Sequence, residues 1–110
     1  MKLTRGDTGN FTFQCLDTQG AVITTIADAI YFTVKASWNT ASAVICKTID
    51  DMTFDENGTY HFTIQPGDTE DLRYGNYMFD IEVTRSGVVT TIAKGVLTIT
   101  EEATWVINKE

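Results

Sequence analysis

Apolar and polar residues alternate along residues 77–84 of this chain. The apolar residues occupy every second position, namely Tyr77, Phe79, Ile81 and Val83. A period of two, with aromatic and β-branched residues on one side, predicts a half-buried β-strand. A shorter version of the pattern lies at residues 58–64, where Tyr60, Phe62 and Ile64 share one side. Each of these two strands opens with Gly-x-Tyr after an acidic turn.

The same periodicity predicts strands in most of the chain. We expect strands at residues 10–16, 29–35, 43–49, 88–94 and 96–100, with short extensions at residues 2–4, 21–25 and 50–53. Short strands separated by turn residues, with no sustained helical pattern, are typical of a sandwich. We therefore predict an all-β, immunoglobulin-like antiparallel β-sandwich of about seven to nine strands. An eight-stranded barrel is the structural alternative.

Glycine and proline set the predicted turns. Pro66, followed by Gly67, is expected to end a strand, and Asp68 or Thr69 to cap the single helical turn that follows. Ser86-Gly87 predicts a hairpin between two strands. Gly95 is expected to mark a bulge or a bend in the last strand.

Length and composition fit one globular domain. The chain has 110 residues, of which 43% are hydrophobic and 21% charged. We expect a single domain over residues 1–110, with residues 101–110 as an interaction tail. The apolar runs are shorter than the roughly 20 residues of a membrane helix. The N-terminus lacks the apolar core of a signal peptide, so we expect no export.

Charge narrows the range of partners. Eight basic residues stand against 15 acidic ones, for a net charge of −7, and the basic residues are scattered singly. Phosphate binding requires clustered Lys and Arg. We therefore expect neither nucleic acid nor membrane as a partner.

Cys15 and Cys46 are the two cysteines. Phe79 occupies the position at which a Gly-x-Tyr-x-Cys strand would carry the second cysteine of an immunoglobulin bridge. We expect two reduced, buried thiols. One histidine and two cysteines do not supply the four ligands of a structural zinc site, so no metal and no cofactor are predicted.

Three polar groups have a chemical and a structural interpretation. His61 lies on the polar side of its strand, which favours a surface residue over a catalytic base. Asp80 and Glu82, about 7 Å apart by strand rise, resemble a glycosidase pair but are typical of a solvated strand face. Residues 50–58 collect oxygen ligands without the spacing of an EF-hand loop, so we expect a solvated turn. The chain is therefore expected not to be an enzyme.

Two tryptophans are candidate contact residues. Trp38, with Asn39 beside it, lies in an expected loop and is a candidate ligand contact, since an exposed indole stacks on sugars. Trp105, Val106 and Ile107 form an apolar cluster near the end and are the candidate interface. Both tryptophans are also compatible with a role as core plugs.

Four segments, at residues 3–8, 64–72, 74–83 and 89–99, carry a family resemblance. Together they resemble small β-sandwich proteins encoded among the structural genes of tailed phages and prophages. They are also similar to N-terminal modules of baseplate or receptor-binding proteins. The resemblance implies a non-enzymatic virion protein of the tail or baseplate region. It would be found in the virion, and in the bacterial cytoplasm during phage assembly.

Two functions follow from these expectations. In the first, the domain assembles with other virion proteins or with copies of itself as a homo-oligomer. In the second, it is a carbohydrate- or receptor-binding module that uses Trp38 and Asn39.

Overall fold

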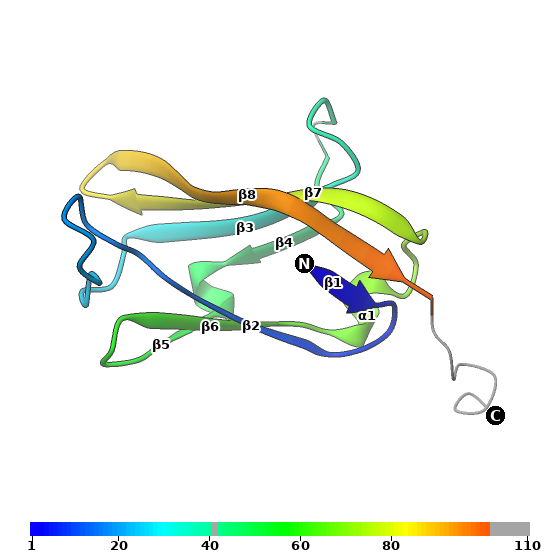
Figure 1. The fold of residues 1–110 in the computed structure, drawn as a ribbon, viewed down its shortest axis with the longest axis horizontal. Coiled ribbons are helices and arrows are strands. Elements are labelled where there is room, and N and C mark those ends of the chain that lie inside the picture. Colours follow the sequence, from blue (N-terminus) through cyan, green and yellow to red (C-terminus); the bar gives the residue numbers. More distant parts are fainter. Residues whose placement is uncertain (41, 102–110) are drawn as a thin grey trace.

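Two sheets packed face to face make up the computed structural model, which describes residues 1–40 and 42–101 (Figure 1). The five-stranded sheet has the order β1 (Lys2–Thr4), β8 (Val88–Thr100), β7 (Gly75–Arg85), β3 (Ala29–Lys35), β4 (Ile45–Thr48). The three-stranded sheet has the order β2 (Gly9–Gln14), β6 (Thr59–Ile64), β5 (Thr53–Phe54). Two short helical segments, η1 (Ile49–Asp51) and α1 (Pro66–Thr69), connect strands of opposite sheets. The predicted all-β sandwich is confirmed.

The strand order follows the immunoglobulin pattern. β2, β6 and β5 form the small sheet, while β4, β3, β7 and β8 form the large one. Strand pairs are antiparallel with one exception among the described residues. β1 runs parallel to β8, with Lys2 opposite Thr98. The antiparallel prediction is therefore wrong for this pair, because the chain leaves β1 for the opposite sheet instead of turning back beside it.

Aromatic rings fill the space between the sheets. Phe32 of β3 and Phe62 of β6 come from opposite sheets, and their ring centroids are 4.8 Å apart. Tyr60 is fully buried and stacks on Phe13 at 5.0 Å. The inward positions of β3, β6, β7 and β8 are buried in alternation, as the period of two predicts, and the fully or nearly fully buried aliphatic residues are Ile30, Val34, Ile64, Leu97 and Ile99.

Two tyrosine hydroxyls anchor loops to the core. The Tyr77 hydroxyl donates to the carbonyl oxygen of Arg73 at 2.8 Å, four residues upstream. This is the tyrosine corner of immunoglobulin domains, at the start of the strand that here carries Phe79 in place of cysteine. The Tyr60 hydroxyl accepts a hydrogen bond from the backbone N–H of Ala27 at 2.9 Å.

Both cysteines are free, but only Cys15 is buried. The prediction of two buried thiols is therefore wrong for Cys46. Cys46 lies opposite Thr33, on the outer face of the large sheet, while its neighbour Ile45 points into the core. Alternation along β4 exposes the thiol.

The bulge in the last strand lies three residues before its predicted position. β8 is continuous through Gly95, and the register shifts where Ile81 pairs with Ala93 and Glu82 with Thr91, so that Ile92 is the extra residue. Gly95 has a different role. A Cβ atom there would lie 2.8 Å from Cε1 of Phe79, so glycine allows the Phe79 ring to cover the strand.

Two local expectations are corrected. The helical turn begins at Pro66 instead of after Asp68, because proline suits the first helical position. Asp68 lies within this turn, and its carboxylate accepts from the Gln65 N–H at 2.7 Å. Of the expected extension at residues 50–53, Asp50 and Asp51 lie in the 3₁₀ turn η1, and Thr53 begins β5.

We predict that Phe62→Ala lowers the free energy of unfolding by about 3–5 kcal/mol, because it removes a buried ring that touches both sheets. Urea denaturation measures this loss. The matched control is Tyr31→Ala on the outer face of β3, where the ring is half exposed and the expected loss is below about 1 kcal/mol. Equal losses in the two variants would contradict the assignment of the inter-sheet contact.

Candidate interaction surfaces

The structure describes one of the two predicted contact sites. Trp105, Val106 and Ile107 lie outside the described residues. Trp38 and Asn39 lie in the β3–β4 loop, and both are exposed. Trp38 has 49% of its surface exposed, so it is not a core plug. The loop is tightened by a hydrogen bond from the N–H of Thr40 to the carbonyl oxygen of Ser37 at 3.2 Å.

One face of the Trp38 ring has a cationic neighbour. The Lys94 ammonium group of β8 lies 5.4 Å from the ring centroid, within the range of a cation–π contact. Lys94 therefore links the β3–β4 loop to the large sheet. The exposed remainder of the ring is available to a ligand.

His61 is a surface residue, as predicted. Its Nε2 atom lies 3.0 Å from Oδ2 of Asp55, in the turn between β5 and β6. The hydrogen bond from His61, followed by the one from the backbone N–H of Thr59, lowers the pKa of the Asp55 carboxyl from its ordinary 3.8. In the turn predicted at residues 50–58, the Asp55 carboxylate is therefore bonded to nearby groups of the protein, namely the His61 side chain and the N–H of Thr59. Within the described part of the chain, no cluster of three or more His, Cys, Asp or Glu side chains is arranged to hold a metal ion.

Asp80 and Glu82 lie on the outer face of the large sheet. They are opposite Thr33 and Tyr31 of β3, respectively. Neither lines the two pockets described below. The interpretation as carboxylates on a strand face fits this placement better than a glycosidase pair.

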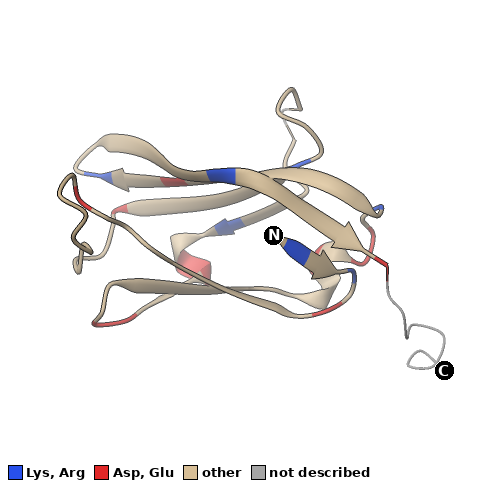
Figure 2. Cartoon of the chain, in the orientation of Figure 1, with Lys and Arg blue, Asp and Glu red and all other residues tan. Residues whose placement is uncertain are grey.

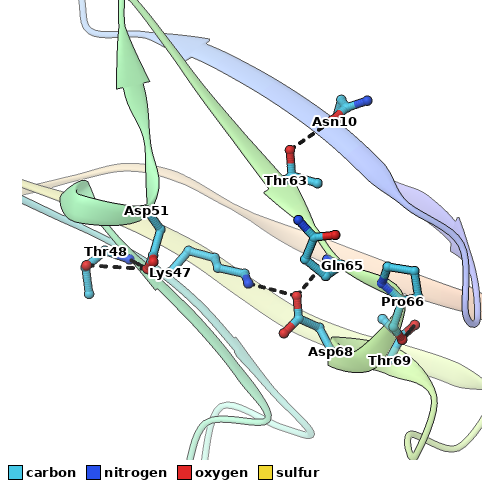
Figure 3. A network of polar contacts seen from close by, with 9 residues as sticks. All are labelled: Asn10, Lys47, Thr48, Asp51, Thr63, Gln65, Pro66, Asp68 and Thr69. Atoms are coloured by element: carbon cyan, nitrogen blue, oxygen red, sulfur yellow. Dashed lines mark hydrogen bonds and ion pairs between the residues drawn. The ribbon is translucent and has the colours of Figure 1, made fainter.

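A polar groove of about 510 Å³ opens on the side of the sandwich where β4 faces β6. Lys47 of β4 reaches across it, and its Nζ atom lies 2.8 Å from Oδ2 of Asp68 in α1 (Figure 3). The ion pair joins the large sheet to the segment that follows the small one. Thr63 donates to Oδ1 of Asn10 on the neighbouring strand at 2.9 Å. Lys47, Thr63 and Asn10 of this groove therefore have structural partners.

The opposite side of the sandwich has a strand edge that is mostly uncovered. β1 pairs only with residues 98–100 of β8, so residues 88–96 have no neighbouring strand on that side among the described residues. Val88 and Val89 are 64% and 61% exposed, and Ile92 and Val96 are also exposed. Lys94 is the only charged residue of β8. Natural proteins usually cover or charge such an edge, because it can pair with another strand.

An apolar pocket of about 260 Å³ lies beside this edge. The hairpin arm of β7 and β8 supplies Val83, Val88 and Ile92, and the connection that follows β2 supplies Leu16 and Ile23. The pocket exists because the long hairpin extends beyond the end of β2, whose last residue is Gln14 (Figure 1). We call the free edge of residues 88–96 together with this pocket the β8 groove.

The β8 groove was not among the sites predicted from sequence. Its signal is the run of residues 88–93, six consecutive uncharged residues without polar alternation on either side. In a strand with one solvated face, alternation is expected. Its absence over these residues indicates a strand with apolar residues on both faces and a charged residue on neither.

Charges are mixed over the described surface. Lys and Arg are interspersed with Asp and Glu along the chain instead of gathering on one strand (Figure 2). The helical segments are short, and none in the described residues has the length and apolarity to span a membrane.

Comparisons with known proteins bear on the fold alone. No family model matches the chain, and no curated protein does. Among solved structures, the chain is similar to an endo-beta-1,4-mannanase from Thermotoga petrophila, with a TM-score of 0.61 and 10% identity. The match covers 92% of this chain but only 17% of the mannanase chain. At this identity it supports the sandwich architecture and carries no activity over.

We predict that Asp55 stabilises the fold above about pH 4 and that this stabilisation is lost as the pH falls. The pKa of Asp55 is lower in the fold than in the unfolded chain, so protonation at acid pH favours unfolding. Asp55→Asn should therefore remove part of the acid-induced decrease in the urea midpoint. Glu56→Gln, an exposed carboxyl in the same turn, is the control and should retain the wild-type decrease. Identical pH profiles for wild type and Asp55→Asn would contradict the assignment.

Proposed function

We propose that this domain is a non-enzymatic structural protein of tailed phages or prophages that acts by protein–protein assembly. Its partners are other virion proteins or copies of itself, in the tail or baseplate region. Its expected locations are the virion and, during assembly, the bacterial cytoplasm. The sequence resemblance at residues 3–8, 64–72, 74–83 and 89–99 motivates the phage context.

The β8 groove is the observation that carries the assembly role. Its edge exposes unpaired backbone over residues 88–96, with apolar side chains on it and an apolar pocket beside it. An uncovered edge of this kind readily accepts another strand. In a particle that contains many copies of a protein, such an edge joins one subunit to the next when a strand of the partner pairs with it.

The described polar clusters support a structural role. Lys47 is paired with Asp68, and His61 with Asp55, so these groups hold turns and sheets together. The mannanase match does not change this proposal, because the chain spans 17% of that enzyme.

The first test is the mass in solution, measured by light scattering on a size-exclusion column over a hundredfold range of concentration. We expect a defined oligomer that dissociates on dilution. Deletion of residues 103–110 should shift the mass toward the monomer while the thermal midpoint changes little. Trp38→Ala is the control and should assemble as the wild type does. A chain that stays monomeric throughout and binds no virion protein would contradict the proposal.

A carbohydrate- or receptor-binding module is the alternative function. The exposure of Trp38, with Asn39 beside it in a loop held by Ser37 and Thr40, favours this second candidate. Indole rings stack on flat apolar faces of ligands, and amide side chains supply the polar contacts.

For this alternative we predict a change in tryptophan fluorescence on titration with bacterial wall oligosaccharides. The variant Trp105→Ala leaves Trp38 as the only indole and should retain the response. Trp38→Ala should lose it. A response that remains in Trp38→Ala, or none with any wall sugar, would remove the ligand-contact role of Trp38 and Asn39.

A further inference from the structure

The β8 groove is the part of the sandwich that lacks a covering strand. β1 occupies only one end of the β8 edge, where the N–H of Thr98 donates to the carbonyl oxygen of Met1 at 2.9 Å. Along the rest of the edge the sandwich stays open between β8 and the connection after β2. A strand added here would extend the large sheet in line with β1.

Backbone groups on this edge are directed outward in a definite pattern. The N–H of Thr98 and the carbonyl oxygen of Thr100 bond to Met1 and Arg5, so even-numbered residues face the edge here. Alternation continues this pattern to Val96 and Lys94. The extra residue Ile92 reverses it, which directs Val89 and Thr91 outward in the hairpin arm. The edge thus offers donors and acceptors on both sides of the bulge.

The pocket beside the edge contains a guanidinium group with unused donors. Arg85 Nη1 donates to the carbonyl oxygen of Thr25 at 2.9 Å. Its Nε and Nη2 atoms are buried and have no hydrogen-bond partner among the described residues. Arg85 lines the same pocket as Val88 and Ile92. A buried donor without an acceptor is costly, so a ligand that brings a carboxylate or carbonyl oxygen is favoured here.

We propose that the β8 groove is a strand-acceptor site and that its occupant is the segment of residues 103–108 from a second copy of this chain. The inference rests on the proposed assembly function and names the surface and the partner segment. It is a case of strand addition to an exposed sheet edge, with main-chain hydrogen bonds for affinity and a pocket for specificity.

The sequence of the tail matches the chemistry of the groove. Residues 103–108 are uncharged and contain Trp105, Val106 and Ile107, which favour strands and apolar pockets. Glu101 and Glu102 precede the segment, and Lys109 and Glu110 follow it. The three carboxylates outnumber this one lysine, and they complement Arg85 and Lys94, the basic residues of the groove.

Chain geometry excludes the tail of the same copy as the occupant. Ile92, the pocket residue nearest Thr100 in the chain, is eight positions before it, which corresponds to about 27 Å along the strand. Ile107 is seven positions after Thr100, so even a fully extended chain spans only about 25 Å. Because the chain must also turn back after Thr100, the apolar residues Trp105, Val106 and Ile107 reach this pocket only in another copy.

The experiment is a titration of a fluorescein-labelled peptide of residues 101–110 with the full chain, followed by anisotropy. The receptor carries Trp105→Ala, which weakens competition from its own tail. We expect saturable binding, and a loss of affinity of at least about tenfold when Val88→Lys is added to the receptor. The matched control, Val44→Lys in the β3–β4 loop, places the same charge on an exposed valine and should bind as before.

A second receptor variant keeps the test valid if Val88→Lys does not fold. Thr91→Pro removes an N–H that faces the open edge and should block strand addition while the hydrogen bonds to β7 remain. Circular dichroism and thermal midpoints establish that each variant is folded. Absence of binding, or binding unchanged by both Val88→Lys and Thr91→Pro, overturns the proposal.

The solution masses of the same variants distinguish failure of the strand-acceptor proposal from failure of the assembly proposal. Wild-type oligomers that persist in Val88→Lys and in Trp105→Ala leave the assembly role intact and overturn the strand-acceptor site. A dimer that Val88→Lys disrupts and Trp105→Ala does not would have β8 of the second copy as occupant, which also overturns the proposal. A monomeric wild type together with a peptide that does not bind overturns both.

Discussion

The contact between Phe32 and Phe62 is the interaction on which the sandwich depends. It joins the two sheets at their centre, where an immunoglobulin domain places its disulfide and tryptophan, and here the two cysteines are free. With no covalent link between the sheets, their separation and relative placement depend on ring packing. Tyr60 and Tyr77 then tie loops to this core through buried or half-buried hydroxyl groups. The core thus provides a rigid frame with loops at both ends.

Unequal sheets follow from this arrangement and determine what the surface offers. Five strands face three, and β7 and β8 are longer than the strands of the small sheet. An apolar pocket lies between the β7–β8 hairpin and the connection after β2, and β1 is too short to cover the β8 edge beside it. On the other side, Lys47 and Asp68 close the gap between the sheets with an ion pair (Figure 3). An ion pair therefore joins the sheets on one side of the sandwich, while the β8 edge on the other side has no neighbouring strand over residues 88–96 among the described residues.

Strand positions were predictable because burial follows alternation. The patterns at residues 59–64 and 77–83 place in or against the core the side chains that the sequence indicated, and residues 29–35 form the expected strand. The position of the bulge was not predictable, because Gly95 is required by the Phe79 ring of the neighbouring strand, which a single-strand pattern does not contain. The exposure of Cys46 likewise depends on which face of β4 meets the core. The β8 groove depends on how strands of the two sheets lie relative to one another, which a single-strand pattern does not contain. Nε and Nη2 of Arg85 lack hydrogen-bond partners among the described residues because folding buries them.

Amide hydrogen exchange resolved by residue, compared between dilute and concentrated protein, tests the central claim most directly. The claim is that the free edge of β8 is the assembly surface. The account predicts that the outward amides of Val89, Thr91, Lys94 and Val96 exchange rapidly in the dilute protein and become protected on assembly. Their neighbours bonded to β7 are expected to be protected in both conditions. Assembly that leaves these four amides unprotected, and protects another surface instead, would contradict the account.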